Sequence, residues 1–187
     1  MSDLFHWDEL NLLRQDTVQF IRESRKKKPD IWEIDRFLDY MEFVLCLIFM
    51  YGWNDAEEIV GVVPFPDGLD DRTVNLEIEG ETFRQRVERQ IDELSDEGVL
   101  RIIETEAHRD YNTGVVAAAQ SSGKSVRKTW NTMLDDRVRD THSYLESMTV
   151  GIDDKFYTYD GDSAMFPGGF SLPENNVNCR CYVTLTV

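Results

Sequence analysis

The sequence predicts an α+β protein, in which an N-terminal helical hairpin precedes a mixed domain of helices packed on a small, largely antiparallel C-terminal sheet. Apolar residues recur at helical spacing through the first 50 or so residues and again from Val99 to about Gln120. The last 40 or so residues instead hold six glycines and prolines, with short β-prone pieces between them. Hydrophobic residues make up 41% of the 187 residues, which is enough for a packed core.

The first expected helix extends from Leu4 to Lys28, where Leu10, Leu13 and Ile21 fall on one apolar stripe. A basic run closes this helix before Pro29. The run consists of Arg25, Lys26, Lys27 and Lys28. Positive charge in a last turn suits the helix dipole, and proline stops the helix from continuing. The same run could also make a local contact with nucleic acid or with an acidic partner.

A second helix is expected from Asp30 to about Tyr51, opened by a capping box of Asp30 and Glu33 and ended by Gly52. The two helices together predict an antiparallel hairpin over residues 1–53 with an aromatic-rich face. That face belongs either to the core or to a docking arm for an assembly partner. If the hairpin docks on a partner, its tryptophans are expected to be exposed. These are Trp7, Trp32 and Trp53.

Residues 54–80 are expected to form an acidic linker with one strand over Thr73–Ile78, and a helix follows from Phe83 to about Leu94. The chain has 20 basic and 36 acidic side chains, a formal net charge of −16. From Gly52 to Tyr111 there are 17 acidic and six basic side chains, a net charge of −11. This charge argues against binding nucleic acid over the whole surface and against docking on an anionic membrane. It favours a partner with a basic surface.

The cysteine content and the N-terminus indicate a protein of a reducing compartment. Three cysteines are too few for a disulfide-stapled scaffold. No basic stretch followed by an apolar core opens the chain, so no signal peptide is expected. The most apolar run, Phe43–Tyr51, is far shorter than the about 20 residues that a membrane helix needs.

Residues that could carry chemistry occur in three stretches, the first of which is the helix expected from Val99 to about Gln120. Glu106 follows Thr105 there and could act as a general base. No nucleophile or oxyanion pattern accompanies it, so a solvated helix face is the favoured interpretation. The sequence Gly123-Lys124-Ser125 resembles the end of a phosphate-binding loop, but the position of the first glycine of that motif is Ala118. A phosphate-binding loop is therefore rejected.

The second stretch extends from Trp130 to His142 and is interpreted as a helix. In a helix, Asp135, Arg139 and His142 share one face. Asp135 and Arg139 are then four residues apart and can form an ion pair. An ordinary salt-bridged helix surface explains this pattern without any chemistry.

The third stretch is a final strand expected over Asn178–Val187. Alternate residues of a strand point to the same side, so Cys179 and Cys181 share one face. With His142 they could supply three zinc ligands, and His108 or an aspartate could supply the fourth. Zinc sites usually show wider cysteine spacing, so two small buried side chains are the simpler alternative. On that alternative no cofactor is expected.

Several motifs of this chain follow one another in a distinctive order. The residues that carry it are Thr105, Glu106, Asn112, Thr113, Gly114, Lys128, Trp130, Asp135, Asp136, Arg137, Arg139, His142, Pro167, Asn178, Cys179, Arg180 and Cys181. This order closely resembles the C-terminal domain of the phage Mu protein F-like family, the phage minor head or head-morphogenesis proteins. The resemblance covers about Thr82 to Val187, so residues 81–187 are expected to form a domain of this kind.

The resemblance implies a virion component that is made in the bacterial cytosol and joins the procapsid in few copies. It implies binding to the portal or major capsid protein during head assembly or DNA delivery. Within the domain, it implies an ion-pair network of Asp135 or Asp136 with Arg137 and Arg139. The core onto which this block packs would contain His142 and the two C-terminal cysteines, with Trp130 as a buried anchor.

The alternative function is that of a virion-carried effector enzyme, nuclease-like or ADP-ribosyltransferase-like. Its candidate catalytic residues are Glu106, Arg137, Arg139 and His142. In other members of the family a toxin or enzymatic module sometimes follows this domain, whereas this chain stops six residues after Cys181. The expectation therefore leans towards a protein without catalysis, in which any contact with DNA is local, at Arg25, Lys26, Lys27 and Lys28.

Overall fold

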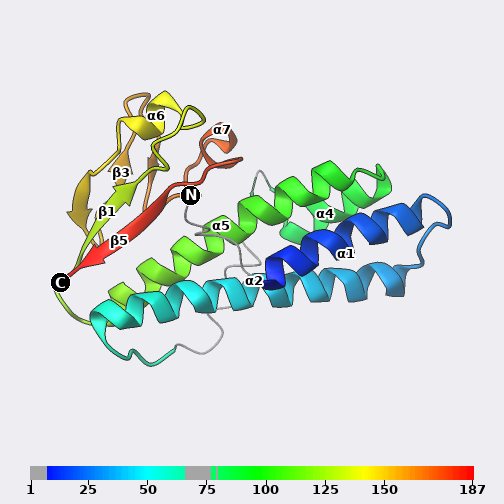
Figure 1. Cartoon of the computed structure of the whole chain (residues 1–187), viewed down its shortest axis with the longest axis horizontal. Helices are drawn as coiled ribbons and strands as arrows, with labels where there is room; N and C mark the ends of the chain where they lie inside the picture. The colour runs from blue at the N-terminus through cyan, green and yellow to red at the C-terminus, as the bar shows by residue number, and fades with distance from the viewer. Residues whose placement is uncertain (1–7, 66–76, 79) are drawn as a thin grey trace.

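The computed structural model of the chain describes residues 8–65, 77–78 and 80–187. Long helices form one end of the molecule and a small antiparallel sheet forms the other, which confirms the α+β class (Figure 1). The helices are α1 (Asp8–Ser24), α2 (Ile31–Val60), α4 (Phe83–Asp92), α5 (Asp96–Ser121), α6 (Asp140–Ser143) and α7 (Pro173–Asn176). The strands are β1 (Arg127–Asn131), β2 (Thr149–Gly151), β3 (Phe156–Tyr157), β4 (Ser163–Ala164) and β5 (Tyr182–Thr186).

Helices α1 and α2 form the antiparallel hairpin that the sequence predicts (Figure 1). The capping box at the start of α2 is confirmed. The Asp30 side chain accepts a hydrogen bond from the Glu33 amide at 2.9 Å, and the Glu33 carboxylate accepts one from the Asp30 amide at 2.9 Å. The α1 helix ends at Ser24, so the basic run Arg25–Lys28 lies in the turn between the helices rather than in a last helical turn.

The expectation that Gly52 ends the second helix is wrong, because α2 continues to Val60 and Gly61 caps it with a φ of 81°. Gly52 instead permits close contact with α5. A Cβ atom at Gly52 would lie 2.0 Å from the Tyr111 carbonyl oxygen. The contact is reciprocal, since a Cβ atom at Gly114 would lie 2.1 Å from the Phe49 carbonyl oxygen. The boundary expected after residue 53 consequently falls inside α2.

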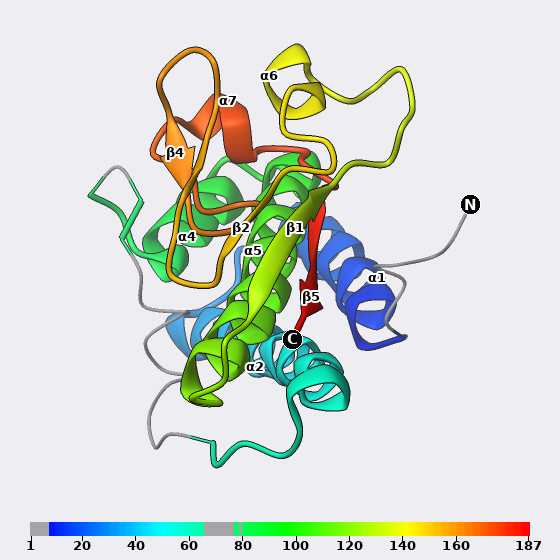
Figure 2. The ribbon, with the colours of Figure 1, turned by 90° about the vertical axis from the view of Figure 1, so that its left-hand side faces the viewer.

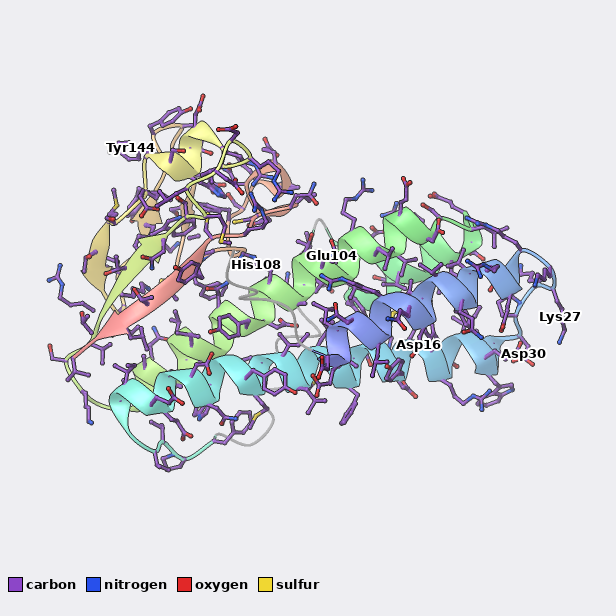
Figure 3. All side chains as sticks on the ribbon, viewed as in Figure 1. Asp16, Lys27, Asp30, Glu104, His108 and Tyr144 are labelled. Atoms are coloured by element: carbon purple, nitrogen blue, oxygen red, sulfur yellow. The ribbon has the colours of Figure 1, made fainter. Side chains whose placement is uncertain are left out.

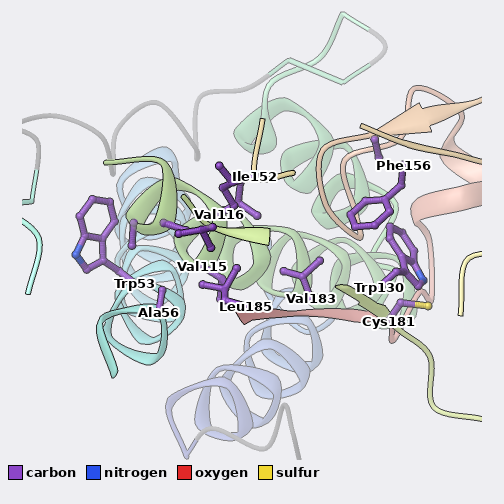
Figure 4. Close-up of a cluster of buried hydrophobic side chains, with 14 of the residues drawn as sticks. Trp53, Ala56, Val115, Val116, Trp130, Ile152, Phe156, Cys181, Val183 and Leu185 are labelled. Carbon is purple, nitrogen blue, oxygen red and sulfur yellow. The ribbon is translucent and has the colours of Figure 1, made fainter. Parts of the chain in front are cut away.

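Two apolar cores share the α2 and α5 helices. The first core fills the space between α1, α4 and the N-terminal halves of α2 and α5, with Leu13, Leu45 and Ile103 among its members. The second core lies between the C-terminal halves of α2 and α5 and the sheet (Figure 4). Trp53 belongs to this second core and is buried, contrary to the docking-arm expectation. Trp32 is 74% exposed, and Trp7 lies outside the described residues.

The three-stranded sheet has the order β2-β1-β5, and both pairings are antiparallel. Trp130 of β1 lies opposite Val183 of β5, and both point into the second core. Val183 and Leu185 are buried while Thr184 is exposed, which is the alternation expected of a strand with one covered face. Figure 2 shows this sheet lying across α5, with β3 and β4 forming a separate two-stranded ribbon.

Two further expectations need correction. The stretch from Trp130 to His142 is not one helix, because its first residues form β1 and only Asp140–Ser143 is helical, as α6. The final strand begins at Tyr182 rather than at Asn178, whose φ of 57° departs from an extended backbone. The expected helices near Phe83 and Val99 are present as α4 and α5.

The strand expected over Thr73–Ile78 lies almost wholly outside the described residues. Only its last residue, Ile78, takes part in a described bridge, which it forms with Glu81. None of the helices in the described part of the chain combines the length and the apolar character that crossing a bilayer requires.

The contact between α2 and α5 predicts that replacing a glycine by alanine decreases the stability of the protein, which is opposite to the usual effect in a helix. In an exposed helix, replacing glycine by alanine stabilises by about 1 kcal/mol. We expect Gly52→Ala to decrease the free energy of unfolding by about 1–3 kcal/mol instead, because its methyl group collides with the Tyr111 carbonyl. Chemical denaturation measures the change. The control is Asn54→Ala at an exposed position of the same helix, where we expect little effect. A more stable Gly52→Ala protein would contradict the close contact.

Candidate functional site

The candidate site lies where α5 meets the C-terminal segment of the chain. It has two parts. One is a buried group of charged side chains on α5 around Glu106, and the other is a cluster of His142, Cys179 and Cys181. His108, on α5, joins the two parts and faces the chain just before β5 (Figure 3).

Glu106 is only 1% exposed, so the expected solvated face is wrong. Its carboxylate accepts a hydrogen bond from Arg86 of α4 at 2.8 Å and forms an ion pair with Arg109 one helical turn along. A buried carboxylate needs such partners. Since both of its oxygens are engaged by guanidinium groups, Glu106 is placed to hold α4 on α5 rather than to take a proton from a substrate. Its neighbour Thr105 is half-buried and donates to the Arg101 carbonyl at 2.8 Å.

Asp110 lies four residues beyond Glu106 and is also buried. Burial raises the pKa of Asp110 to about 8, and the charge of Arg109 opposes this only in part. Neither carboxyl oxygen has a hydrogen-bond partner within the described ranges of the chain. At neutral pH the side chain is therefore mainly protonated, and this part of α5 carries less negative charge than its sequence suggests.

His108 and Asn112 attach the C-terminal strand to α5. The His108 Nε2 lies 2.5 Å from the Cys181 carbonyl oxygen, and the Asn112 amide oxygen accepts a hydrogen bond from the Val183 amide at 3.2 Å. The Asn112 amide nitrogen donates to the His108 carbonyl at 2.9 Å, which fixes its orientation. His108 therefore holds the backbone of Cys181 and does not join the histidine and cysteine side chains as the expected fourth ligand.

The loop before α7 also closes over this part of α5. Pro167 is buried, and Gly168 follows it with a φ of 90°. A Cβ atom at Gly168 would lie 3.1 Å from Cα of Arg109, so glycine allows both the turn and the close approach. The family residue Pro167 thus belongs to the packing of the loop on α5.

The His142 side chain meets both C-terminal cysteines. Its Nδ1 atom lies 3.5 Å from the Sγ atom of Cys179 and 3.5 Å from that of Cys181. All three residues are buried, and their possible ligand atoms lie within 4.8 Å of one another. The Trp130 ring meets the His142 ring edge-on at 5.5 Å between centroids, and Phe170 stacks on it at 5.3 Å. The prediction that the two cysteines face the same side is confirmed.

The two thiols influence one another strongly. A hydrogen bond between them lowers the pKa of Cys179 well below its ordinary value, and the nearby His108 and His142 rings act in the same direction. The same hydrogen bond, together with burial, raises the pKa of Cys181. Cys179 is consequently the thiol that loses its proton first. The three cysteines of the chain, Cys46 included, are free of disulfides.

Asp135 pairs with Arg180 rather than with Arg139. The guanidinium of Arg180 donates to both carboxylate oxygens, at 2.6 and 2.8 Å. Residues 132–139 form a loop, so helical spacing does not apply there. Arg139 instead donates to the Val177 carbonyl. The hydrogen bonds from Arg180, followed by that from the Arg137 amide, lower the pKa of Asp135 to about 2.

Arg137 also contacts Asp135, as expected: its amide donates to the carboxylate at 3.1 Å, and its exposed guanidinium lies 3.7 Å from it. Asp136 is exposed. Asn178 is also exposed, but its left-handed backbone directs Cys179 and Cys181 towards His142. Asparagine adopts this conformation more readily than most residues.

Three important residues escaped the sequence reasoning as parts of the site. Arg86 pairs with Glu106 across two helices, and no local pattern marks it. Lys128 is buried in β1 and donates to the Ile152 carbonyl at 2.7 Å, and burial lowers its pKa to about 8. Asp162 accepts hydrogen bonds from Ser171 Oγ at 2.6 Å and Asn175 at 2.9 Å, which ties α7 to the loop before β4. For Lys128 a signal was available, because it is one of the residues that carry the family resemblance.

Comparison with known proteins places these residues in a family context. The family model described as phage Mu protein F like protein matches residues 75–184. The chain is 33% identical over 79 residues to the minor head protein GP7 of Bacillus phage SPP1, which covers 41% of this chain and 26% of that protein. It is 35% identical over 92 residues to the NAD(+)–arginine ADP-ribosyltransferase EFV of Enterococcus faecalis, which covers 48% of this chain and 19% of that protein.

The matched stretches therefore span about a quarter or less of these two relatives. No solved structure matches the chain.

The Asp135–Arg180 pair predicts that the pKa of Asp135 changes measurably when Arg180 is replaced. We expect Arg180→Met to return the pKa of Asp135 from about 2 towards its ordinary value of about 3.8, because the main hydrogen-bond donors are lost. Since the pKa is lowered in the folded state, the pair stabilises the fold above pH about 4 and ceases to do so as the pH falls towards 2. Carboxyl ¹³C chemical shifts followed against pH measure the pKa.

The matched control for this titration is Arg127→Met, at an exposed arginine of β1 that donates to the Thr149 carbonyl. It should leave the Asp135 titration unchanged. An Asp135 pKa that stays near 2 in Arg180→Met would show that another group holds the carboxylate.

Proposed function

The chain belongs to the family of phage Mu protein F-like proteins, and from this membership we propose that it is a minor head protein that binds the portal or major capsid protein during head assembly or DNA delivery. The observation that carries the proposal is the family match over residues 75–184, which includes every polar residue of the candidate site. The 33% identity to the minor head protein GP7 supports the same role.

The roles of the family's charged residues in this fold favour assembly over catalysis. Glu106 holds Arg86 and Arg109, and Asp135 holds Arg180. The pair of Glu106 with Arg86 is buried and connects α4 to α5, and the partly exposed pair of Asp135 with Arg180 connects residues 45 positions apart. A buried ion pair restricts the arrangements that a fold can adopt. These contacts support a structural use of the charges.

The partner surface that we propose is the outer side of α2. Three large apolar side chains stand exposed there: Ile31 is 61%, Trp32 74% and Phe43 61% exposed. Aromatic side chains with this exposure commonly mark protein contacts and often contribute a large share of the binding energy. The net charge of −16 favours a partner with a basic surface. In this proposal the hairpin of α1 and α2 carries the docking surface, and residues 81–187 form the family domain.

The tip of the hairpin is the proposed place for any contact with packaged DNA. Lys27 and Asp30 lie at the end of the molecule farthest from the sheet (Figure 3). In the basic run, Lys26, Lys27 and Lys28 are exposed at this tip, whereas Arg25 pairs with Asp96 at the start of α5. The acidity of the rest of the protein repels polyanions, so any such contact would be local to the three lysines. We propose that the protein is made and assembled in the cytoplasm of the bacterial host and then resides in the virion. Assembly through surface contacts requires no cofactor.

The test of this function is co-expression of the chain with the portal protein, or with the major capsid protein, of the same phage. We expect the two proteins to elute together in size-exclusion chromatography at low salt, and to separate as salt screens the charges. Trp32→Ala should weaken the complex by about 2 kcal/mol, or roughly 30-fold in Kd, if this indole anchors the contact.

The matched control is Tyr144→Ala, because Tyr144 is also an exposed aromatic residue but lies beside α6, away from the hairpin (Figure 3). It should leave binding unchanged. Separate elution from both partners at low salt would argue strongly against the proposed role.

A second function is favoured by one observation, the 35% identity to the arginine ADP-ribosyltransferase EFV. On this alternative the chain is a virion-carried effector, ADP-ribosyltransferase-like or nuclease-like. Most of its candidate catalytic side chains are buried or already hydrogen-bonded within the protein, which does not favour contact with a substrate. Glu106 and His142 are each 1% exposed, Arg139 donates to a backbone carbonyl, and only Arg137 has a largely exposed side chain, at 70%.

We expect no transfer of ADP-ribose when the purified chain is incubated with NAD⁺ and an arginine-rich acceptor protein, and no cleavage of plasmid DNA. Mass spectrometry of the acceptor and gel electrophoresis of the plasmid measure these outcomes. An authentic arginine ADP-ribosyltransferase serves as the positive control. Transfer or cleavage that disappears in Arg137→Ala, a variant with an exposed and structurally neutral change, would rank the enzymatic function first.

A further inference from the structure

We propose that His142, Cys179 and Cys181 bind one zinc ion through Nδ1 of the histidine and the two Sγ atoms. The three residues come from α6 and from the segment before β5, and they are the one group of this kind within the described parts of the chain. Two sulfurs and one imidazole nitrogen are ligands that zinc prefers among the common divalent metals. The inference concerns the stability of the domain and is independent of the assembly role.

The distances between the ligand atoms match a tetrahedral zinc site. With zinc–sulfur bonds of about 2.3 Å and zinc–nitrogen bonds of about 2.0–2.1 Å, a sulfur and a nitrogen at two corners of the tetrahedron lie about 3.6 Å apart. Both observed Nδ1–Sγ distances are 3.5 Å. Both nitrogen–sulfur distances therefore fit a shared ion, and the two sulfurs lie within 4.8 Å of each other.

Hydrogen bonding alone explains the positions of His142, Cys179 and Cys181 less well than a bound metal ion does. A neutral imidazole nitrogen has one lone pair, so Nδ1 of His142 can accept only one hydrogen bond at full strength. Two thiols nevertheless lie at the same distance from that atom. A metal ion placed between the three atoms satisfies all of them at once.

The surrounding side chains fix the ligands before any ion arrives. The rings of Trp130 and Phe170 pack on His142 and set the direction of its Nδ1. On the other side, the left-handed backbone at Asn178 and the start of β5 place the two sulfurs. Figure 4 shows the Cys181 sulfur beside the Trp130 ring. Such preorganisation reduces the entropy lost on binding.

The charges at the site also balance. On binding, both thiols release their protons to solvent, and two thiolates neutralise the two positive charges of the ion. Three arginines line a small cavity that borders the site, and each has another partner. Arg180 and Arg137 pair with Asp135, and Arg139 donates to the Val177 carbonyl. The three ligands, Met133, Val138 and Asn178 complete the lining. A water molecule in this cavity would complete the fourth position.

The bound ion would connect α6 to the C-terminal segment, two parts of the chain that are 37 and 39 residues apart at the ligands. A link of this length removes many conformations from the unfolded chain, as a disulfide does. It would also explain why a pair of cysteines with only one residue between them occurs at the edge of a packed core.

Elemental analysis of the full chain tests the site. Protein purified under reducing conditions without a chelator, after addition of zinc chloride, should contain one zinc per chain. Replacement of zinc by Co²⁺ should produce the intense near-ultraviolet charge-transfer absorption of thiolate-bound cobalt. Chelation should lower Tm. Cys179→Ser and Cys181→Ser should each lose the zinc and the absorption, and their Tm should no longer respond to a chelator.

The matched control is Cys46→Ser, which changes the remaining cysteine, located in α2, and should keep the full zinc content. If the other variants fail to fold, the cobalt spectrum of the unmodified protein decides. Zinc far below one per chain, a cobalt spectrum without the thiolate band, or a mass two hydrogens lower from a Cys179–Cys181 disulfide under the same conditions would overturn the proposal.

Discussion

The close contact between α2 and α5 determines how the rest of the molecule is arranged. Glycines at positions 52 and 114 let the two backbones approach to a distance that no side chain permits. Because both apolar cores use these two helices, the contact sets the width of each core. It also decides where α5 presents His108 and Asn112, and therefore where β5 lies. A helix pair thus positions β5 and the residue before it, whose contacts with α5 join residues 71 and 73 positions apart in the sequence.

The segment of α5 that contains Glu106, His108 and Asn112 explains why the polar residues of the family motif lie close together. Glu106 faces α4, whereas His108 and Asn112 face the C-terminal segment. The strand held by these residues brings Cys179 and Cys181 to His142, and its Arg180 reaches back to Asp135. The charged residues therefore act mainly as connections between segments. This arrangement suits a protein whose task is to keep a defined shape in an assembly.

Patterns within a few residues were predictable, and partners across the chain were not. The capping box of Asp30 and Glu33 depends on neighbouring residues alone, and it is present. Cys179 and Cys181 both meet His142, but they precede β5, so the alternation of a strand is not the reason. The role of Gly52 depends on its contact with Tyr111 of α5, a helix much later in the sequence, so the local rule that glycine ends a helix failed. Glu106 looked solvated because its partner Arg86 lies on another helix, and Asp135 found Arg180 instead of the nearby Arg139.

The length of α2 has a mechanical consequence. Its 30 residues extend about 45 Å, and the helix reaches from the turn beside Trp32 to the second core. Because α2 contributes to both apolar cores along this length, and contacts the α5 backbone at Gly52, it joins the helical end of the molecule to the sheet end as one continuous packed body.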